Sequence, residues 1–129
     1  NLPPTQGTRN SGAFIPGVYS FDYEVSNIEG VRGAGFTALR LPVNSDTASD
    51  VGVLARMQAW VEAIGGDAIV CMWDDNSSDR HGDGHGNGRV SDVSTMAAAW
   101  KTIHAAFVDF PCVMYEVFNE PFGYHRQEE

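Results

Sequence analysis

The clearest pattern in the chain is a stripe of apolar residues between positions 50 and 65. Its members recur at spacings near 3.6 residues, the period of an α-helix; they are Val53, Leu54, Met57, Trp60, Val61 and Ile64. Asp50 is a good N-cap, and Gly65 with Gly66 is the expected C-terminal stop. The pattern predicts an amphipathic helix over 50–65.

Two further helices are predicted from the same period. Val25, Ile28 and Val31 lie three residues apart, which favours a short helix over 24–34 with a glycine-rich end. The second helix runs to about residue 110, because Pro111 stops it. Its apolar face holds Met96, Trp100, Ile103 and Phe107, and its possible N-caps are Ser91, Asp92 and Ser94.

Apolar runs between the helices predict β-strands. Residues 36–43 combine β-branched, aromatic and aliphatic side chains. Residues 68–73 form a continuous apolar run, which is typical of a parallel strand covered on both faces. Residues 112–118 form the last run. An earlier run, 13–20, is interrupted by a proline and a glycine, and it is expected to be a broken first strand.

The strands and helices alternate along the chain. This order predicts an α/β fold with a parallel sheet and crossover helices. Residues 1–12 are expected to be coil, and 74–92 form a long polar loop. The length of 129 residues allows one domain at most.

The charge of the chain argues against some classes of partner, and its cysteines bear on the compartment in which it works. The net charge of −9 argues against nucleic acid and against a membrane surface as partners, because both require a basic face. No apolar run approaches the roughly 18 residues of a membrane span. Cys71 and Cys112 lie in or beside apolar runs and are expected to be buried thiols, with a disulfide as the alternative in a secreted protein. The chain starts with Asn1, so either a leader was removed or the chain belongs to a longer one.

Polar residues gather where the strands end. The carboxyl ends of parallel strands share one edge of a sheet, and ligands bind there. The residues that this arrangement brings to one rim are Arg40 and Asn44 from the first strand, Trp73, Asp74 and Asp75 from the second, and Asn119 and Glu120 from the third. Glu116, inside the last strand, is expected to be structural, through a bond to a neighbouring strand.

Three segments resemble glycoside hydrolase family 5, the cellulase family. Residues 36–42 (FTALRLP) are similar to its Arg-x-Pro strand, and 113–121 (VMYEVFNEP) to its Asn-Glu-Pro strand. Residues 96–103 resemble the helix that leads into that second strand. The resemblance implies a partial (β/α)8 TIM barrel of roughly the first four βα units. It implies that 13–129 form the N-terminal half of the catalytic domain, and that the C-terminal half-barrel is missing.

The resemblance also implies roles for individual residues. Glu120 would be the catalytic acid/base, and Asn119 would hydrogen-bond the sugar 2-hydroxyl. Arg40 would hold the nucleophilic carboxylate, which the family carries near its seventh strand and which this chain lacks; the alternative for Arg40 is a structural ion pair. Apart from the resemblance, Trp73 is expected either to stack on a sugar or to be a core residue, and Asp74 to bind substrate. The family often places a histidine after its third strand, which corresponds to residues 68–73 when the interrupted run 13–20 is counted as the first strand. This chain has aspartates there, so Asp74, Asp75, His81 or His85 would take the place of that histidine.

The predicted function is hydrolysis of a β-linked polysaccharide or oligosaccharide, β-glucan first and mannan second, with retention. No metal or other cofactor is implied, and the loop with His81 and His85 is expected to border the cleft rather than to bind a metal. An extracellular location follows from the resemblance, because the polymer lies outside the cell. Two alternatives stay open: a non-catalytic half-barrel that binds glycans or another partner, and a half-barrel completed by a second chain.

Overall fold

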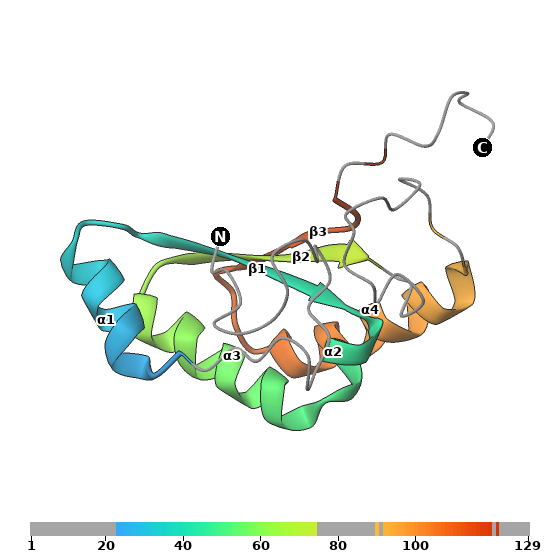
Figure 1. Cartoon of the computed structure of the whole chain (residues 1–129), viewed down its shortest axis with the longest axis horizontal. Helices are drawn as coiled ribbons and strands as arrows, with labels where there is room; N and C mark the ends of the chain where they lie inside the picture. The colour runs from blue at the N-terminus through green and yellow to red at the C-terminus, as the bar shows by residue number, and fades with distance from the viewer. Residues whose placement is uncertain (1–22, 75–89, 91, 120, 122–129) are drawn as a thin grey trace.

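The computed structural model describes residues 23–74, 90, 92–119 and 121. Within them the chain forms one parallel sheet with helices packed along one side (Figure 1). The strand order is β1 (Ala38–Asn44), β2 (Asp67–Asp74) and β3 (Val113–Glu116). The predicted α/β fold with parallel strands is therefore confirmed for three strands. The interrupted strand expected at 13–20 lies outside the described residues.

The helices are α1 (Val25–Gly33), α2 (Ser45–Ser49), α3 (Val51–Ile64) and α4 (Val93–Phe107). Three of them match the predictions closely, and α2 was not predicted. Asp92, one of the three candidate N-caps, begins α4 by accepting a hydrogen bond from the Ser94 amide at 2.8 Å. The helix ends earlier than expected, because the Phe110 amide bonds to the Phe107 carbonyl at 3.0 Å and forms a turn.

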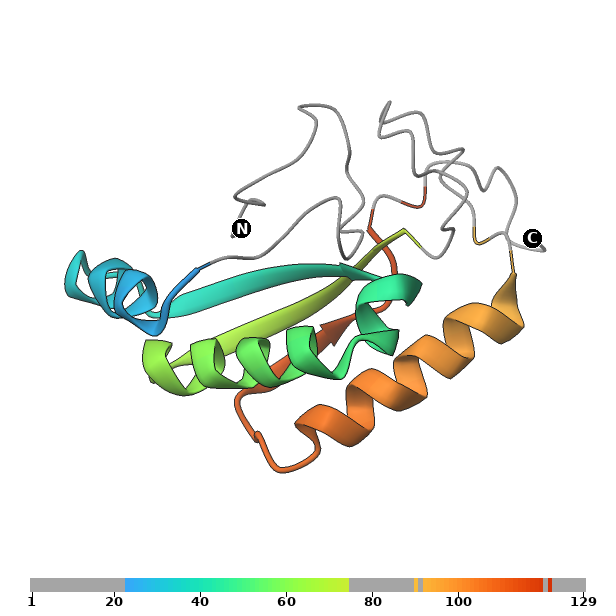
Figure 2. The same ribbon diagram turned by 60° about the horizontal axis from the view of Figure 1, so that its bottom comes forward.

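The core lies between the sheet and the helices α3 and α4, which cover the same face of it in both views (Figure 2). All six residues of the predicted α3 stripe are buried. Trp60 is 1 % exposed, and its indole N–H donates to the Tyr23 carbonyl at 3.1 Å. The helical spacing of apolar residues in the sequence therefore predicted correctly which residues of α3 belong to the core.

The other two predicted stripes are only partly buried. In α1, Ile28 is fully buried while Val25 is 42 % exposed. In α4, Trp100 is half-buried, and its indole N–H donates to the Val117 carbonyl at 3.1 Å. Ala99 occupies the buried position beside it. Trp100 thus lies at the border of the core, where its indole N–H can keep the hydrogen bond to Val117 that it would lose in the interior.

The turn between α3 and β2 depends on two glycines. Gly65 adopts the left-handed conformation, with φ of 62°, that glycine tolerates best. Gly66 is needed for a different reason, namely space. A Cβ atom there would lie 2.0 Å from the Thr37 carbonyl oxygen, which accepts a hydrogen bond from the Asp67 amide at 3.1 Å. The close approach of these two backbones starts the pairing of β1 with β2.

Both cysteines are unpaired thiols, Cys71 buried and Cys112 half-buried. The structure therefore contains no disulfide between Cys71 and Cys112. Among the described helices, none is both long enough and apolar enough to cross a bilayer.

The Gly66 contact gives a stability prediction. Gly66→Ala should lower the free energy of unfolding by about 1–3 kcal/mol, because the methyl group would push the Thr37 carbonyl away from the Asp67 amide. Gly30→Ala is the matched control. It lies in α1 with no atom within 4 Å of its added Cβ, so it should raise stability by up to about 1 kcal/mol. Urea denaturation measures both, and equal effects of the two variants would contradict this account of the turn.

Candidate active site

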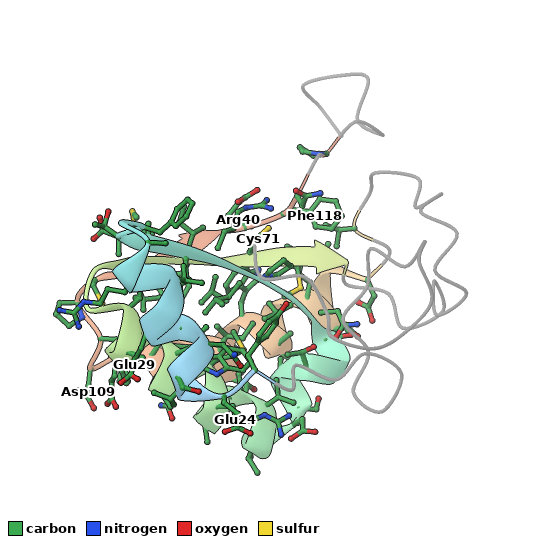
Figure 3. The ribbon with its side chains drawn as sticks, turned by 60° about the vertical axis from the view of Figure 1, so that its left-hand side comes forward. Glu24, Glu29, Arg40, Cys71, Asp109 and Phe118 are labelled. Carbon is green, nitrogen blue, oxygen red and sulfur yellow. The ribbon has the colours of Figure 1, made fainter. Side chains whose placement is uncertain are left out.

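The candidate site lies on the face of the sheet that the helices leave uncovered. Side chains alternate between the two faces of a strand. Leu39, Leu41 and Val43 of β1 belong to the core under the helices, so Arg40 is directed to the opposite face. Figure 3 shows Arg40 and Cys71 next to each other on that face, away from the helices.

The parallel register explains why these side chains meet. Pro42 of β1, Cys71 of β2 and Glu116 of β3 form one row across the sheet. Arg40 lies one row earlier on the same face of β1. Adjacent strands are about 4.8 Å apart, so β1 and β3 are separated by about 10 Å. A long arginine side chain can cross that distance over the small Cys71 and reach Glu116.

In the part of the chain that the structure describes, the guanidinium of Arg40 binds the side chains of Glu116, Asn119 and Cys71. Its Nε donates to Glu116 Oε2 at 2.7 Å, and its Nη2 donates to Glu116 Oε1 at 2.6 Å, which makes a two-bond fork. Nη2 also donates to Asn119 Oδ1 at 2.8 Å and to Cys71 Sγ at 3.0 Å. One cation thus gathers groups from β2, from β3 and from the segment after β3.

The ionisation of these groups follows from the contacts. The hydrogen bonds from Arg40 lower the pKa of the Glu116 carboxyl, and the same pairing raises the pKa of Arg40. Burial raises the pKa of the Cys71 thiol to about 12, although the Arg40 charge opposes that shift. At neutral pH the cluster is therefore a guanidinium, a carboxylate and a protonated thiol.

Asn119 is held by its backbone as well as by its side chain. Its amide N–H donates to the Met72 carbonyl at 2.8 Å, which extends the pairing of the third strand with β2 beyond Glu116. The predicted meeting of Arg40 and Asn119 at one rim is thus present in the structure. Glu120 follows Asn119 directly and lies outside the described residues.

The remaining predicted site residues have different outcomes. Asn44 does not join the cluster: its Oδ1 caps α2 by accepting from the Thr47 amide at 2.8 Å, and the residue is fully buried. Trp73 and Asp74 complete β2, and their side chains lie outside the described part of the chain. The other candidates for the expected histidine position lie outside it too; they are Asp75, His81 and His85.

Glu116 is the site residue that sequence reasoning undervalued. It was expected to be structural, through a bond to a neighbouring strand. Its main partner, however, is Arg40, which lies two strands away. The signal available in the sequence was one charge of each sign inside two otherwise apolar strands. Within the described residues, no three or more His, Cys, Asp or Glu side chains cluster in a way that suits a metal ion.

The two thiols should differ in reactivity. Cys71 is fully buried with a pKa of about 12, whereas Cys112 is half-buried. Alkylation by iodoacetamide at pH 8 should therefore modify Cys112 and leave Cys71 intact, because the thiolate is the reactive form. Mass spectrometry of the two peptides checks this. Labelling in guanidinium chloride is the control, in which both thiols should react; equal labelling in the folded protein would contradict the burial of Cys71.

The Arg40–Glu116 pair should make stability depend on pH. A carboxyl whose pKa is lowered by folding contributes stability above its unfolded pKa and loses that contribution as pH falls through the folded value. The stability difference between the wild type and Glu116→Gln should therefore be largest at neutral pH and shrink as pH falls below about 4.5. Urea unfolding at several pH values measures it. Glu62→Gln, at an exposed position on α3, should change stability at pH 7 by less than about 0.5 kcal/mol.

Comparison with known proteins gives a family match for this chain. Residues 8–129 match the family model described as Cellulase (glycosyl hydrolase family 5). A search of curated proteins gave no significant match, and a search of solved structures gave none either. The family match covers most of the chain, including all three strands and the Arg40, Glu116 and Asn119 cluster. The chain belongs to glycosyl hydrolase family 5, a family of cellulases.

Proposed function

We propose that the protein carrying this chain hydrolyses O-glycosidic bonds in a β-linked polysaccharide, with β-glucan as the first candidate substrate. The observation that carries the proposal is the cluster of Arg40, Glu116 and Asn119, which lies at the carboxyl ends of parallel strands directly before Glu120. Ligands bind at that end of the sheet in parallel α/β folds. Family membership supplies the reaction class, glycoside hydrolysis.

Glu120 is the proposed acid/base. Cleavage passes through an oxocarbenium-like state, and one carboxylic acid protonates the departing oxygen. In a retaining enzyme a second carboxylate, about 5–5.5 Å away, attacks the sugar and forms a covalent intermediate. Water then hydrolyses this intermediate, with Glu120 acting as the base. Pro121 follows Glu120 immediately and restricts the backbone before it, which favours a fixed position for the acid.

Asn119 and Arg40 are proposed to bind substrate and to support the reacting groups. Asn119 is suited to the sugar 2-hydroxyl, because its backbone is tied to β2 and its side chain to Arg40. A hydrogen bond to that hydroxyl strengthens in the transition state. Trp73 and Asp74, at the end of β2, are proposed to line the sugar site by stacking and by hydrogen bonding.

The nucleophile is proposed to come from further strands that complete a (β/α)8 barrel, for which residues 13–129 supply the N-terminal half. The outer strand supports this, because apolar side chains on and after β3 are open to solvent; Met114 is 50 % and Val117 64 % exposed. Further strands would cover them and would pair with the edge of β3 that has no neighbour among the described residues. Because polysaccharide is too large to enter a cell, we also propose an extracellular protein.

Glu120→Gln in the complete protein tests the proposal. The amide cannot protonate the leaving oxygen, so hydrolysis of unactivated β-glucan should fall by about 10²–10⁴-fold, while polysaccharide binding stays near the wild-type level. Release of reducing sugars measures the first effect and affinity electrophoresis the second. An aryl glycoside with a good leaving group should lose less activity in its first step, because that step needs little protonation.

Glu62→Gln is the matched control, at an exposed position on α3, and it should keep full activity. Near-normal turnover of β-glucan by Glu120→Gln would refute the assignment of Glu120. A wild-type protein that binds β-glucan without cleaving it would instead favour a non-catalytic glycan-binding module. Cleavage that requires association of this chain with a second one would show that the barrel is completed in trans.

A further inference from the structure

Glu116 and Asn119 are connected through one atom of Arg40. Nη2 of the guanidinium donates to Glu116 Oε1 at 2.6 Å and to Asn119 Oδ1 at 2.8 Å. The second Glu116 oxygen binds Nε at 2.7 Å, so the carboxylate sets the plane of the guanidinium and not only its distance. The position of Nη2, and with it the contact to Asn119, therefore depends on Glu116.

The contact with Arg40 also decides which end of the Asn119 amide is presented to a ligand. A guanidinium has only donors, so the atom that faces it must be the carbonyl oxygen Oδ1. The Nδ2 group is then turned away from Arg40. The Asn119 backbone is anchored to Met72, and exchange of the two amide atoms would place the donor Nδ2 against the donor Nη2, so the contact with Arg40 opposes that exchange. Asn119 consequently offers an N–H donor to a ligand oxygen.

Cys71 provides the space in which this arrangement fits. It occupies the middle of the row between Pro42 and Glu116, directly under the path of the Arg40 side chain. Its sulfur accepts a hydrogen bond from Nη2 at 3.0 Å. A larger side chain at this buried position would push the guanidinium away from the sheet. Cys71, whose thiol is protonated, therefore packs between the sheet and the Arg40–Glu116 pair.

We propose that Glu116 is a positioning residue that, through Arg40, orients the Asn119 amide toward the sugar hydroxyl next to the cleaved bond. The inference deepens the proposed function and rests on it. It assigns Glu116 no contact with the substrate. It makes the contribution of Glu116 depend on the 2-hydroxyl, because that hydroxyl is the group that the oriented amide would bind.

The test compares two aryl β-glucosides or β-cellobiosides that differ only in whether the sugar at the cleaved bond carries a 2-hydroxyl. In the complete protein, Glu116→Gln should lower kcat/KM for the 2-hydroxy substrate by about 10- to 100-fold, mostly through kcat. For the 2-deoxy substrate the same variant should stay within about threefold of the wild type. Asn119→Ala should show the same selectivity, and adding Glu116→Gln to it should produce little further loss.

Tyr115→Phe is the matched control. It changes the neighbouring position on the opposite face of β3, where Tyr115 packs against Trp100 of α4. This variant should affect both substrates equally and weakly. Equal losses on both substrates for Glu116→Gln would overturn the proposal, because they would show a general structural role. If Glu116→Gln does not fold, Glu116→Asp serves instead, since the shorter side chain keeps the carboxylate but cannot make both bonds of the fork, and it should give the same selective loss.

A second measurement does not depend on activity. In NMR spectra the Arg40 Nε–H should exchange slowly with water in the wild type and in Tyr115→Phe, and faster in Glu116→Gln, because its carboxylate acceptor is lost. Equal exchange rates in all three would refute the positioning role. A wild-type protein that cleaves neither glycoside would refute the proposed function instead, and the exchange rates would still decide whether Glu116 orients Arg40.

Discussion

The parallel register of β1, β2 and β3 is the constraint on which the site depends. It places Pro42, Cys71 and Glu116 in one row and leaves Arg40 one row behind them on the same face. A shift of one residue in any strand would turn its side chains to the opposite face. The core under α3 and α4 prevents such a shift, because it would expose the alternating apolar residues that those helices cover. Burial on one face of the sheet thus fixes the chemistry on the other.

The Arg40–Glu116 pair orients side chains of the site more than it stabilises the folded protein. Both side chains are partly exposed, 23 % for Arg40 and 36 % for Glu116, and ion pairs in such surroundings contribute little to folding. The two-bond fork nevertheless fixes the direction of the guanidinium, and the guanidinium in turn has Asn119 as a partner. A site that stabilises a transition state gains from groups that are oriented before the substrate arrives.

The sequence predicted the regular elements well where one strong pattern was present. The α3 stripe correctly predicted a continuous part of the core, because six apolar residues spaced at the helical period form one apolar face of the helix, and that face is buried. The short helix α2 was missed, since five residues give no period, although Asn44 is a suitable N-cap for it. Strand β3 is shorter than the apolar run that predicted it, and Phe36, expected in β1, is 63 % exposed and bonds back to Val31 of α1.

The sequence by itself determined which chemical groups the chain brings to the strand ends, because the motif around Arg40 and the motif ending in Asn119 and Glu120 can be read without any coordinates. It did not determine which of these groups bind one another. Arg40 and Glu116 are 76 positions apart in the chain and lie on strands that do not touch. Only the tertiary structure, by setting the register on both sides of β2 and placing a small residue there, decided that the arginine reaches across to the glutamate and holds the asparagine.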